Sequence, residues 1–393
     1  MATNDGTFRV PPPVNEPILG YLPGSRERQE LKARLATMSG ERLDIPVVIG
    51  GREYRTGRTH ASVMPHNHRH VLAEWHAADA ALVQKAIESS IAAGREWGSW
   101  RWEDRAAVFL RAAELLATTW RATLNAATML GQSKVAFQAE IDSACELIDF
   151  LRFNAHFAEQ IYAEQPLSTH AAWNRLDYRP LEGFVYAITP FNFTAIGGNL
   201  TAAPALMGNT VVWKPSATAM VSAYYTLRLL EAAGLPPGVI NFVPGDPVEV
   251  SNVVLDSRDL AGIHFTGSTT VFNALWKRAA DHVGHYRGYP RLVGETGGKD
   301  FIVAHPSADP QAVAVALVRG GFEYQGQKCS AASRVYIPAS LWTEVRDRSV
   351  AMMRDITVGD VREFQTFMGA VIDRKAFDRI SDRKSTRLNS SHT

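Results

Sequence analysis

The sequence predicts an α/β fold in which a parallel sheet carries helices on both faces. The main observation is the stretch after Arg175, where short apolar segments alternate with helical ones, a pattern typical of parallel sheets. The chain has 393 residues, which suggests two or three domains. Hydrophobic residues make up 46% and charged residues 21%, a composition that supports a sizeable core.

The elements follow one another in a regular order. Residues 1–30 are polar and rich in proline, and we expect a surface segment without regular structure. Residues 45–75 contain short apolar pieces and turn residues that indicate a small strand pair. From Ala77 to about Phe157 apolar residues recur at helical spacing. The alternating region then predicts strands at GFVYAI, TVVWKPS, GVINFVPG, AGIHFTGS, RLVGE and FIVA, and helices at NLTAAPALM, SAYYTLRLLEAAG, 270–283 and 311–322.

Charge and cysteine content narrow the classes of function. Lys and Arg number 41 and Asp and Glu 40, for a net charge of +1, so nothing electrostatic favours nucleic acid or an acidic membrane as a partner. No segment reaches the roughly 20 apolar residues of a membrane span, and the first residues lack the pattern of a secretory signal or transit peptide. Two cysteines indicate a reducing compartment. We expect a soluble intracellular protein.

Cys329 is the candidate nucleophile. It lies in GGFEYQGQKCSAASRVYIP (320–338), a glycine-punctuated loop between a helix and an apolar strand. Lys328 is adjacent, and nearby positive charge favours the thiolate. Taken alone, the loop also fits a buried structural cysteine. Cys145, by contrast, lies on the apolar stripe of a helix, and we expect it in the core.

Two further polar residues follow strands. Glu295 in GETGGK (294–299) is followed by glycines that let a ligand approach, and it could be a general base or a solvated turn residue. Asn192 in TPFNFTAIGGN (189–199) lies beyond the carboxyl end of a strand, where ligands bind in open α/β sheets. Its amide could donate to an oxyanion or bond only its own loop.

Two strand–turn pieces fit a cofactor site. WKPS (213–216) places Lys214 just after a strand, and FTGS (265–268) puts Gly267 and Ser268 before a helix, where phosphate can bind. Each is a weak signal alone, because the G-x-G-x-x-G fingerprint is absent. The alternating histidines of HNHRH (66–70) indicate an exposed strand or loop rather than a metal site, and we expect no metal.

The order of these motifs carries more information than any one of them. PFNF, WKPS, FTGS, GETGGK and GQKCSA together resemble the aldehyde dehydrogenase superfamily, including the Glu295–Cys329 separation of 34 (329 − 295). Longer stretches, such as NEPILGYLPGSRER and EIDSACELIDFLRFNA, resemble its 1-pyrroline-5-carboxylate dehydrogenase branch. The similarity runs from about Asn15 to about Ile380. It implies a Rossmann-like, parallel-sheet cofactor domain and a second, incomplete α/β catalytic domain.

The resemblance also implies a reaction, the NAD(P)-dependent oxidation of L-glutamate 5-semialdehyde to L-glutamate in proline catabolism. Cys329 would attack the aldehyde as a thiolate and form a thiohemiacetal. The Asn192 amide and the Cys329 N–H would hold the oxyanion. Loss of hydride would leave a thioester, which water activated by Glu295 would hydrolyse.

Cofactor and substrate contacts follow from the same resemblance. Lys214 would reach the adenosine ribose, Gly267 and Ser268 would approach the pyrophosphate, and Ser330 would neighbour the substrate. We expect NAD as the cofactor. Relatives selective for NAD place a glutamate three residues after the lysine, and because Ala217 stands there, NADP stays open. The expected cofactor-binding residues are Thr189, Pro190, Lys214, Ser216, Gly267 and Ser268.

The resemblance divides the chain and implies partners. We expect a small-molecule aldehyde as substrate and a homodimer or higher homo-oligomer, in the cytoplasm or, in a eukaryote, the mitochondrial matrix. The expected parts are an extended N-terminal surface segment at 1–45, an NAD(P)-binding domain at 46–293 with an oligomerisation hairpin at about 166–183, a partial catalytic domain at 294–380, and a polar tail outside the family at 381–393.

The resemblance ends at ISDRKSTRLNSSHT (380–393). Motifs that the family carries beyond this point do not occur, so we expect a truncated reading frame whose product is poorly soluble or inactive. Two alternatives stay open. One is another semialdehyde dehydrogenase of the superfamily, against which CELIDF (145–150) and the long N-terminal segment argue. The other is a non-catalytic nucleotide-binding fragment, in which Cys329 would not react faster than Cys145.

Overall fold

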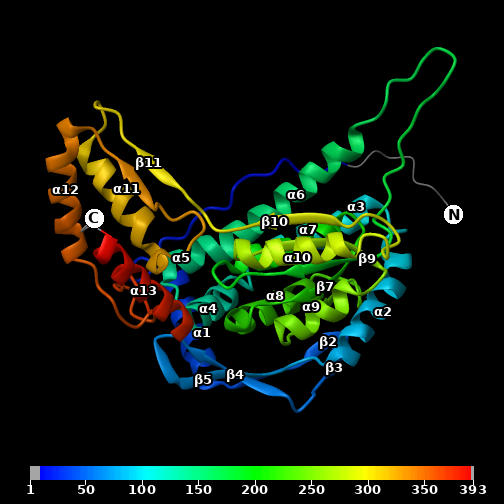
Figure 1. Cartoon of the computed structure of the whole chain (residues 1–393), viewed down its shortest axis with the longest axis horizontal. Helices are drawn as coiled ribbons and strands as arrows, with labels where there is room; N and C mark the ends of the chain where they lie inside the picture. Colours follow the sequence, from blue (N-terminus) through cyan, green and yellow to red (C-terminus); the bar gives the residue numbers. More distant parts are fainter. Residues whose placement is uncertain (1–8, 391–393) are drawn as a thin grey trace.

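A seven-stranded sheet forms the centre of the molecule (Figure 1). The computed structural model describes residues 9–390 of the chain. Five neighbouring strands are parallel, and two more are added antiparallel at one edge. In spatial order the strands are β10 (Arg291–Glu295), β9 (Leu260–Thr266), β6 (Phe184–Ile188), β7 (Thr210–Lys214), β8 (Ile240–Phe242), β2 (Val47–Ile49) and β3 (Arg52–Tyr54).

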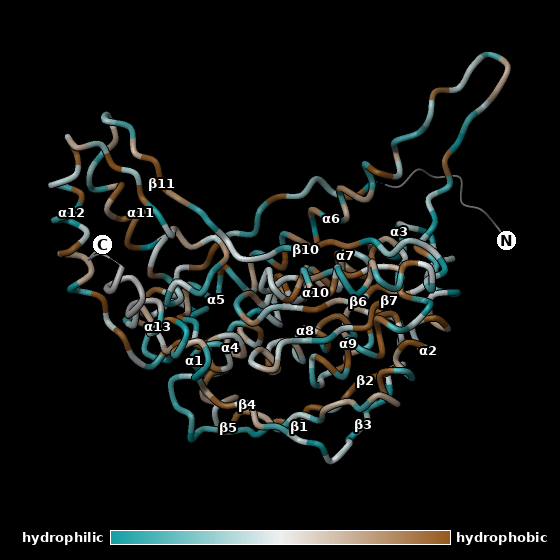
Figure 2. The backbone as a smooth tube through the Cα atoms, viewed as in Figure 1, coloured by the Kyte–Doolittle hydropathy of each residue, from teal (hydrophilic) through white to brown (hydrophobic). Residues whose placement is uncertain are grey.

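The five inner strands, β9, β6, β7, β8 and β2, are buried on both faces because they are apolar at successive positions, whereas the outer strands β10 and β3 are largely exposed. In β6, Phe184 and Tyr186 belong to one core, and Val185 and Ala187 to the core on the other side. The central strands are accordingly brown in Figure 2. The first core is closed by α2 (Ala80–Trp97), α9 (Pro247–Leu255) and α10 (Thr269–Asp281). The second is closed by α7 (Thr194–Leu206) and α8 (Met220–Ala232), backed by α3 (Trp102–Ala117), α4 (Arg121–Gln132) and α6 (Glu146–Ala163).

The strands and helices expected between 184 and 322 are confirmed. They are β6 to β10, α7, α8 and α10, together with β11 (Phe301–Val303) and α11 (Pro310–Phe322). Helix α9 lies between β8 and β9, where the sequence predicted no element. Where one strand pair was expected within 45–75, the structure has two antiparallel pairs, β2 with β3 and β4 (Thr59–Met64) with β5 (Asn67–His76), and β1 (Leu43–Ile45) adds to β5.

The N-terminal segment is extended only in part. Residues 9–25 contain no helix or strand, but Arg26–Gly40 form α1, so the expectation of an extended 1–45 is wrong here. The physical reason is a helical stripe, Leu31, Leu35 and Met38, that is buried and packs on α4. The Ser25 hydroxyl caps this helix by accepting from the N–H of Arg28. Residues 1–8, for which the same extended structure was expected, lie outside the residues that the structure describes.

A smaller α/β unit follows the central sheet (Figure 1). Strand β11 pairs in parallel with β12 (Arg334–Tyr336), and α11 packs on α12 (Ala339–Arg354). Its small core contains Ala304, Val313, Ala314 and Val345. Strand β10 pairs with β9 as far as Glu295, so the boundary expected after residue 293 falls within a strand. The rest of the domain division stays a prediction.

Residues 164–183 form a long arm between α6 and β6 that projects from the body (Figure 1). Near its tip the N–H of Thr169 donates to the carbonyl of Ala172 over 2.9 Å. Leu167 and Trp173 are 91% and 82% exposed. The arm lies where the hairpin was expected, and its role in assembly stays a prediction.

The end of the chain contains α13 (Arg374–Ser390), which extends into the polar tail expected at 381–393. The last three residues of that tail, 391–393, lie outside the described residues. Between residues 9 and 390, no helix combines the length and apolar character needed to cross a membrane.

A buried charged network fixes the N-terminal segment to the helices. Glu140 begins η1 (Glu140–Cys145), a π-helical turn before α6. It accepts from the N–H of Leu19 over 2.9 Å and from the hydroxyl of Tyr21 over 2.6 Å. Arg121 forms an ion pair with Glu140 and another with Glu16. Burial opposes ionisation of Glu140, but the hydrogen bonds from Arg121 and Tyr21 dominate and hold the pKa of this carboxyl below its usual value.

We expect Arg121→Met to lower the free energy of unfolding by about 3–5 kcal/mol, because it leaves Glu140 as an unpaired buried charge. Urea unfolding at neutral pH measures the change. Arg26→Met is the control, since the Arg26–Glu30 pair is exposed to solvent and should contribute far less to stability. Equal effects of the two substitutions would contradict the assignment.

Candidate active site

The carboxyl edge of the parallel strands collects the residues that the motifs singled out. Thr189 follows β6, Lys214 ends β7, Gly267 lies just beyond β9, and Glu295 ends β10. Strand β6 pairs with β7 on one side and β9 on the other, so the order of the strands reverses at β6. A crevice at such a switch point is where open α/β sheets bind ligands.

The Cys329 loop is held at this edge by Asn192. The side-chain amide of Asn192 donates to the carbonyl of Gln327 over 3.0 Å. Cys329 lies two residues further on, after η3 (Glu323–Gly326), with its side chain half-buried. The structure therefore brings the expected nucleophile and the expected oxyanion donor together from segments far apart in the sequence. The Asn192 amide thus binds the loop that carries Cys329, and not only its own turn.

Glu295 is exposed to solvent and near enough to Cys329 for its charge to act on the thiol. Burial raises the pKa of the Cys329 thiol, and the Glu295 carboxylate raises it further. The hydroxyl of Thr266 lies 3.5 Å from Glu295 Oε2, and the N–H of Gly267 donates to the Glu295 carbonyl over 3.1 Å. An exposed carboxylate beside a thiol is suited to activating a water molecule that attacks an acyl group on that thiol.

Gly298 is a site residue that the sequence did not single out. A Cβ atom placed on Gly298 would lie 1.3 Å from the carbonyl oxygen of Cys329, whereas one on Gly297 would meet nothing within 4 Å. The chain after Glu295 therefore lies directly against the backbone of the nucleophile, and only glycine permits this approach. The second glycine of GETGGK is visible in the sequence. That this position must be glycine is clear only from the structure, in which the Cys329 loop lies against it.

Lys328 does not activate Cys329 in the way the sequence suggested. Its Nζ lies 3.2 Å from the Asp142 carboxylate and 3.6 Å from Glu323. The charge is thus engaged by carboxylates, and the thiol pKa is raised instead of lowered. The expectation from adjacency in the sequence is wrong on this point, because neighbouring side chains in a loop can face different directions.

Cys145 is confirmed as a core residue. It is 4% exposed and lies in η1 beside the Arg121–Glu140 pair. Burial, with Glu140 next in importance, raises its pKa to about 12. A thiol with this pKa stays protonated at neutral pH and is a poor nucleophile.

Lys214 and Thr189 lie buried at the strand ends where the cofactor was expected. The Trp213 indole donates to the Thr189 hydroxyl over 2.9 Å, and the Thr189 N–H donates to the Lys214 carbonyl. Lys214 is 8% exposed, and this burial lowers its pKa to about 8 despite the opposing effect of Asp246. Pro190 lines a small cavity with Thr189 and Trp213, and Ser216 is half-buried just past β7.

Gly267 and Ser268 lie at the start of α10. The Ser268 hydroxyl caps the helix by accepting from the N–H of Val271 over 3.3 Å, and Ser268 itself is exposed. The N–H of Gly267 is used by the Glu295 carbonyl. A phosphate at this helix N-terminus would therefore meet the first-turn N–H groups of α10 rather than that of Gly267. Ser330, expected next to the substrate, is exposed directly after Cys329.

The histidine motif HNHRH lies at the start of β5, which belongs to the three-stranded sheet β1–β5–β4 and not to the parallel sheet that ends in Glu295. Within the part of the chain that the structure describes, no three His, Cys, Asp or Glu side chains are grouped so that they could hold a metal ion.

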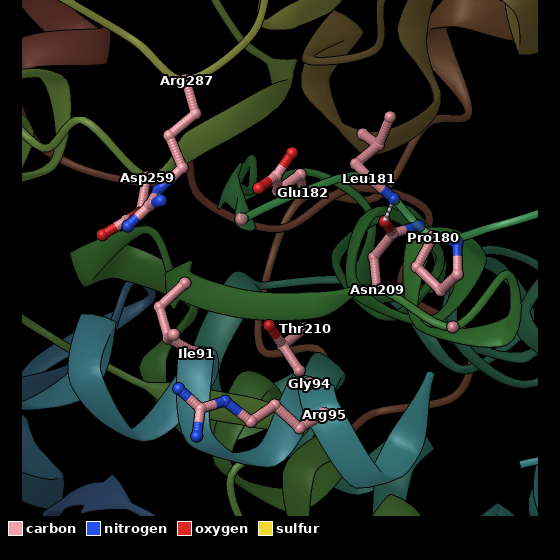
Figure 3. A pocket seen from close by; sticks show the side chains of 12 residues that line it. Ile91, Gly94, Arg95, Pro180, Leu181, Glu182, Asn209, Thr210, Asp259 and Arg287 are labelled. Atoms are coloured by element: carbon pink, nitrogen blue, oxygen red, sulfur yellow. Dashed lines mark hydrogen bonds and ion pairs between the residues drawn. The ribbon is translucent and has the colours of Figure 1, made fainter. Parts of the chain in front are cut away.

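A second hollow, of about 370 Å³, lies at the opposite, amino edge of the sheet (Figure 3). Asn209 and Thr210 at the start of β7 line it, together with Glu182, Asp259 and Arg287. Arg287 is paired with Asp259. None of the sequence-predicted site residues lines this hollow, so the candidate active site is at the other edge.

Comparison with known proteins identifies the class. The sequence profile of the aldehyde dehydrogenase family matches residues 53–390, and the chain belongs to this family. The fold agrees with that of solved relatives. Delta-pyrroline-5-carboxylate dehydrogenase from Mycobacterium tuberculosis bound with NAD aligns over 97% of this chain and 71% of its own, with TM-score 0.95 and 53% identity. The Thermus 1-pyrroline-5-carboxylate dehydrogenase with bound NAD aligns over 94% of this chain and 71% of its own, with TM-score 0.87 and 30% identity.

Curated sequences point to the same branch. The mitochondrial delta-1-pyrroline-5-carboxylate dehydrogenase of Dictyostelium discoideum is 50% identical over 94% of this chain and 67% of its own length. The human mitochondrial enzyme of that name is 49% identical over 93% of this chain and 65% of its own length. The chain thus spans about two thirds of the length of these relatives.

We expect Gly298→Ala to displace the Cys329 loop and to lower the free energy of unfolding by about 1–3 kcal/mol, because the added methyl group overlaps a backbone oxygen. Urea unfolding measures the stability, and iodoacetamide labelling followed by mass spectrometry reports the state of Cys329. Gly297→Ala is the matched control and should change neither. A Gly298→Ala protein that matches the control in both assays would contradict the close approach.

Lys214 should make stability depend on pH. Its folded-state pKa of about 8 lies below the ordinary 10.5, so between these values the unfolded chain binds more protons and stability rises with pH. Below about pH 8, Lys214 is protonated in both the folded and the unfolded chain, so its buried charge lowers the free energy of unfolding by the full amount. We expect Lys214→Met to gain roughly 1–3 kcal/mol at pH 7, with the gain shrinking towards pH 10.

Urea unfolding of both proteins at pH 7 and pH 9.5 measures this difference. Lys277→Met, on the exposed face of α10, should show no such dependence. A Lys214→Met gain of the same size at both pH values would show that the lysine carries no buried charge.

Proposed function

We propose that this protein oxidises L-glutamate 5-semialdehyde, the open form of 1-pyrroline-5-carboxylate, to L-glutamate with NAD as the electron acceptor. The observation that carries the proposal is the meeting of Cys329, Asn192 and Glu295 at the carboxyl edge of the sheet. The names of the relatives, which are 47–53% identical to this chain, supply the substrate. In this role the protein belongs to proline catabolism.

The chemistry assigned to the chain's own residues is that of a thiol nucleophile. The Cys329 thiolate adds to the aldehyde carbon, and the Asn192 amide with the Cys329 N–H stabilises the resulting oxyanion. Glu295 takes a proton from water, which attacks the Cys329 thioester. Glutamate then leaves and the thiolate is restored. The raised thiol pKa means that a substrate or cofactor must help to form the thiolate at neutral pH.

The residues at the strand ends fit a dinucleotide. Lys214 offers a buried ammonium for ribose hydroxyls, with Ser216 beside it, and the N-terminus of the 13-residue helix α10 suits the pyrophosphate near Gly267 and Ser268. Thr189 and Pro190 complete the wall. Bound NAD would accept the hydride that leaves the thiohemiacetal. Ala217 is exposed and uncharged, so nothing at this position repels a 2′-phosphate, and NADP is a second cofactor to test.

Assembly and compartment form part of the proposal. The exposed apolar side chains Leu167 and Trp173 on the projecting arm support its role in a homodimer or higher oligomer. Several relatives are named as mitochondrial, which fits the mitochondrial matrix in a eukaryote and the cytoplasm otherwise.

We expect Cys329→Ala to abolish NADH formation from glutamate semialdehyde while NAD binding survives, because the covalent intermediate cannot form. Absorbance at the NADH band and calorimetric NAD titration measure the two properties. The Glu295→Gln protein should form one equivalent of NADH, after which its steady-state turnover should be slower by about 100-fold or more, because hydrolysis of the thioester lacks its general base.

Cys145→Ser is the matched control and should retain turnover. A protein that binds NAD but forms no NADH from this aldehyde, with Cys329 no more reactive than Cys145, would instead support a nucleotide-binding fragment. Turnover of other semialdehydes at a higher kcat/KM would reassign the substrate.

A further inference from the structure

A buried ammonium group lies behind the two loops that form the active site. Lys134 follows α4 and is 0% exposed. It forms an ion pair with Asp142 of η1. An ion pair taken entirely out of water is costly unless its surroundings are closely arranged. Lys134 and Asp142 therefore require packing on every side, and the groups that supply it belong to the catalytic loops.

On one side Lys134 contacts the segment that carries the oxyanion donor. Its Nζ lies 4.2 Å from the centre of the Phe193 ring, a distance suited to a cation–π interaction. Phe193 is 6% exposed and directly follows Asn192. Fixing this ring restricts the backbone from which the Asn192 amide projects.

On the other side Lys134 contacts the segment that carries the nucleophile. Its Nζ lies 4.4 Å from the centre of the Tyr324 ring, which is fully buried. Asp142 also binds Lys328, the residue before Cys329, over 3.2 Å. Lys328 Nζ in turn lies 5.6 Å from the Phe193 ring. Lys134 and Asp142 together thus contact the Cys329 loop at Tyr324 and at Lys328. Lys134 also contacts Phe193, in the turn that carries Asn192.

The loop needs external support of this kind. Tyr324 and Gln325 have positive φ angles of 50° and 57°, in the left-handed region that residues other than glycine rarely adopt. The Gln325 side chain is held by the carbonyl of Ala370 over 2.7 Å and by the N–H of Gly369 over 3.1 Å. Such a backbone persists only where neighbouring groups determine it.

We propose that Lys134 is a positioning residue which, through Asp142, Phe193 and Tyr324, fixes the Cys329 loop against Asn192. The inference rests on the nucleophilic role of Cys329 in the proposed function, although its test needs no aldehyde oxidation. Lys134 is fully buried and contacts Asp142, Phe193 and Tyr324, so it acts through these side chains. Its effect is on the distance between the thiol and the group that stabilises the oxyanion.

Two reactions of Cys329 separate positioning from stability. Alkylation by iodoacetamide requires only an accessible thiolate. Acylation by p-nitrophenyl acetate also passes through an oxyanion and therefore requires Asn192 in place. For Lys134→Met we expect acylation to slow by about 10–100-fold, while alkylation of the folded protein changes by less than about threefold. A purely structural role would reduce both rates in proportion to the folded fraction, which circular dichroism measures.

Lys277→Met makes the same chemical change on the exposed surface of α10 and should alter neither rate. Asp142→Asn, which is nearly isosteric, should reproduce the selective loss and decides the question if Lys134→Met does not fold. Retention of acylation within about twofold in either folded variant, equal loss of both reactions, or failure of both variants to fold would overturn the proposal. A wild-type chain that acylates normally but oxidises no semialdehyde would refute the proposed substrate and leave the role of Lys134 standing.

Discussion

The parallel pairing of β6, β7, β9 and β10 is the constraint on which the rest of the structure depends. Parallel strands direct all their carboxyl ends to one edge, so the residue that follows each strand arrives at the same place. Backbone hydrogen bonds then join the turns to one another. The Thr189 N–H donates to the Lys214 carbonyl, and the Gly267 N–H to the Glu295 carbonyl. Because of these bonds, the candidate base and the candidate cofactor residues belong to one rigid frame, to which only the Cys329 loop has to be added.

Much of this arrangement is visible in the sequence. The strands from β6 to β9 are short apolar runs, and the order of PFNF, WKPS, FTGS, GETGGK and GQKCSA indicated the aldehyde dehydrogenase superfamily. Local patterns suffice here because a strand buried on both faces has a distinctive composition. Local patterns could not predict where the Lys328 side chain points, because its position depends on the ion pair with Asp142, which is distant in the sequence. The closeness of Gly298 to Cys329 depends on the same kind of distant contact.

Helix α1 shows a different limit of local patterns. Its stripe of Leu31, Leu35 and Met38 is visible in the sequence, but the proline-rich residues before it favoured the prediction of an extended segment.

The π-helical turn η1 carries the most consequential long-range contacts. Glu140 on this turn holds the N-terminal segment, and Asp142, two residues later, holds Lys134 and Lys328. A π-helical turn changes the directions of successive side chains and often occurs near functional sites.

The N-terminal segment has a consequence for the order in which the chain folds. The N–H groups of Glu16 and Leu19 are satisfied by Asp149 and Glu140, more than a hundred residues later. During synthesis these first residues leave the ribosome long before their acceptors exist, so they cannot dock until α4, η1 and the start of α6 have formed. This segment is made before its partners but is fixed only after them, when it closes over helices that have already packed.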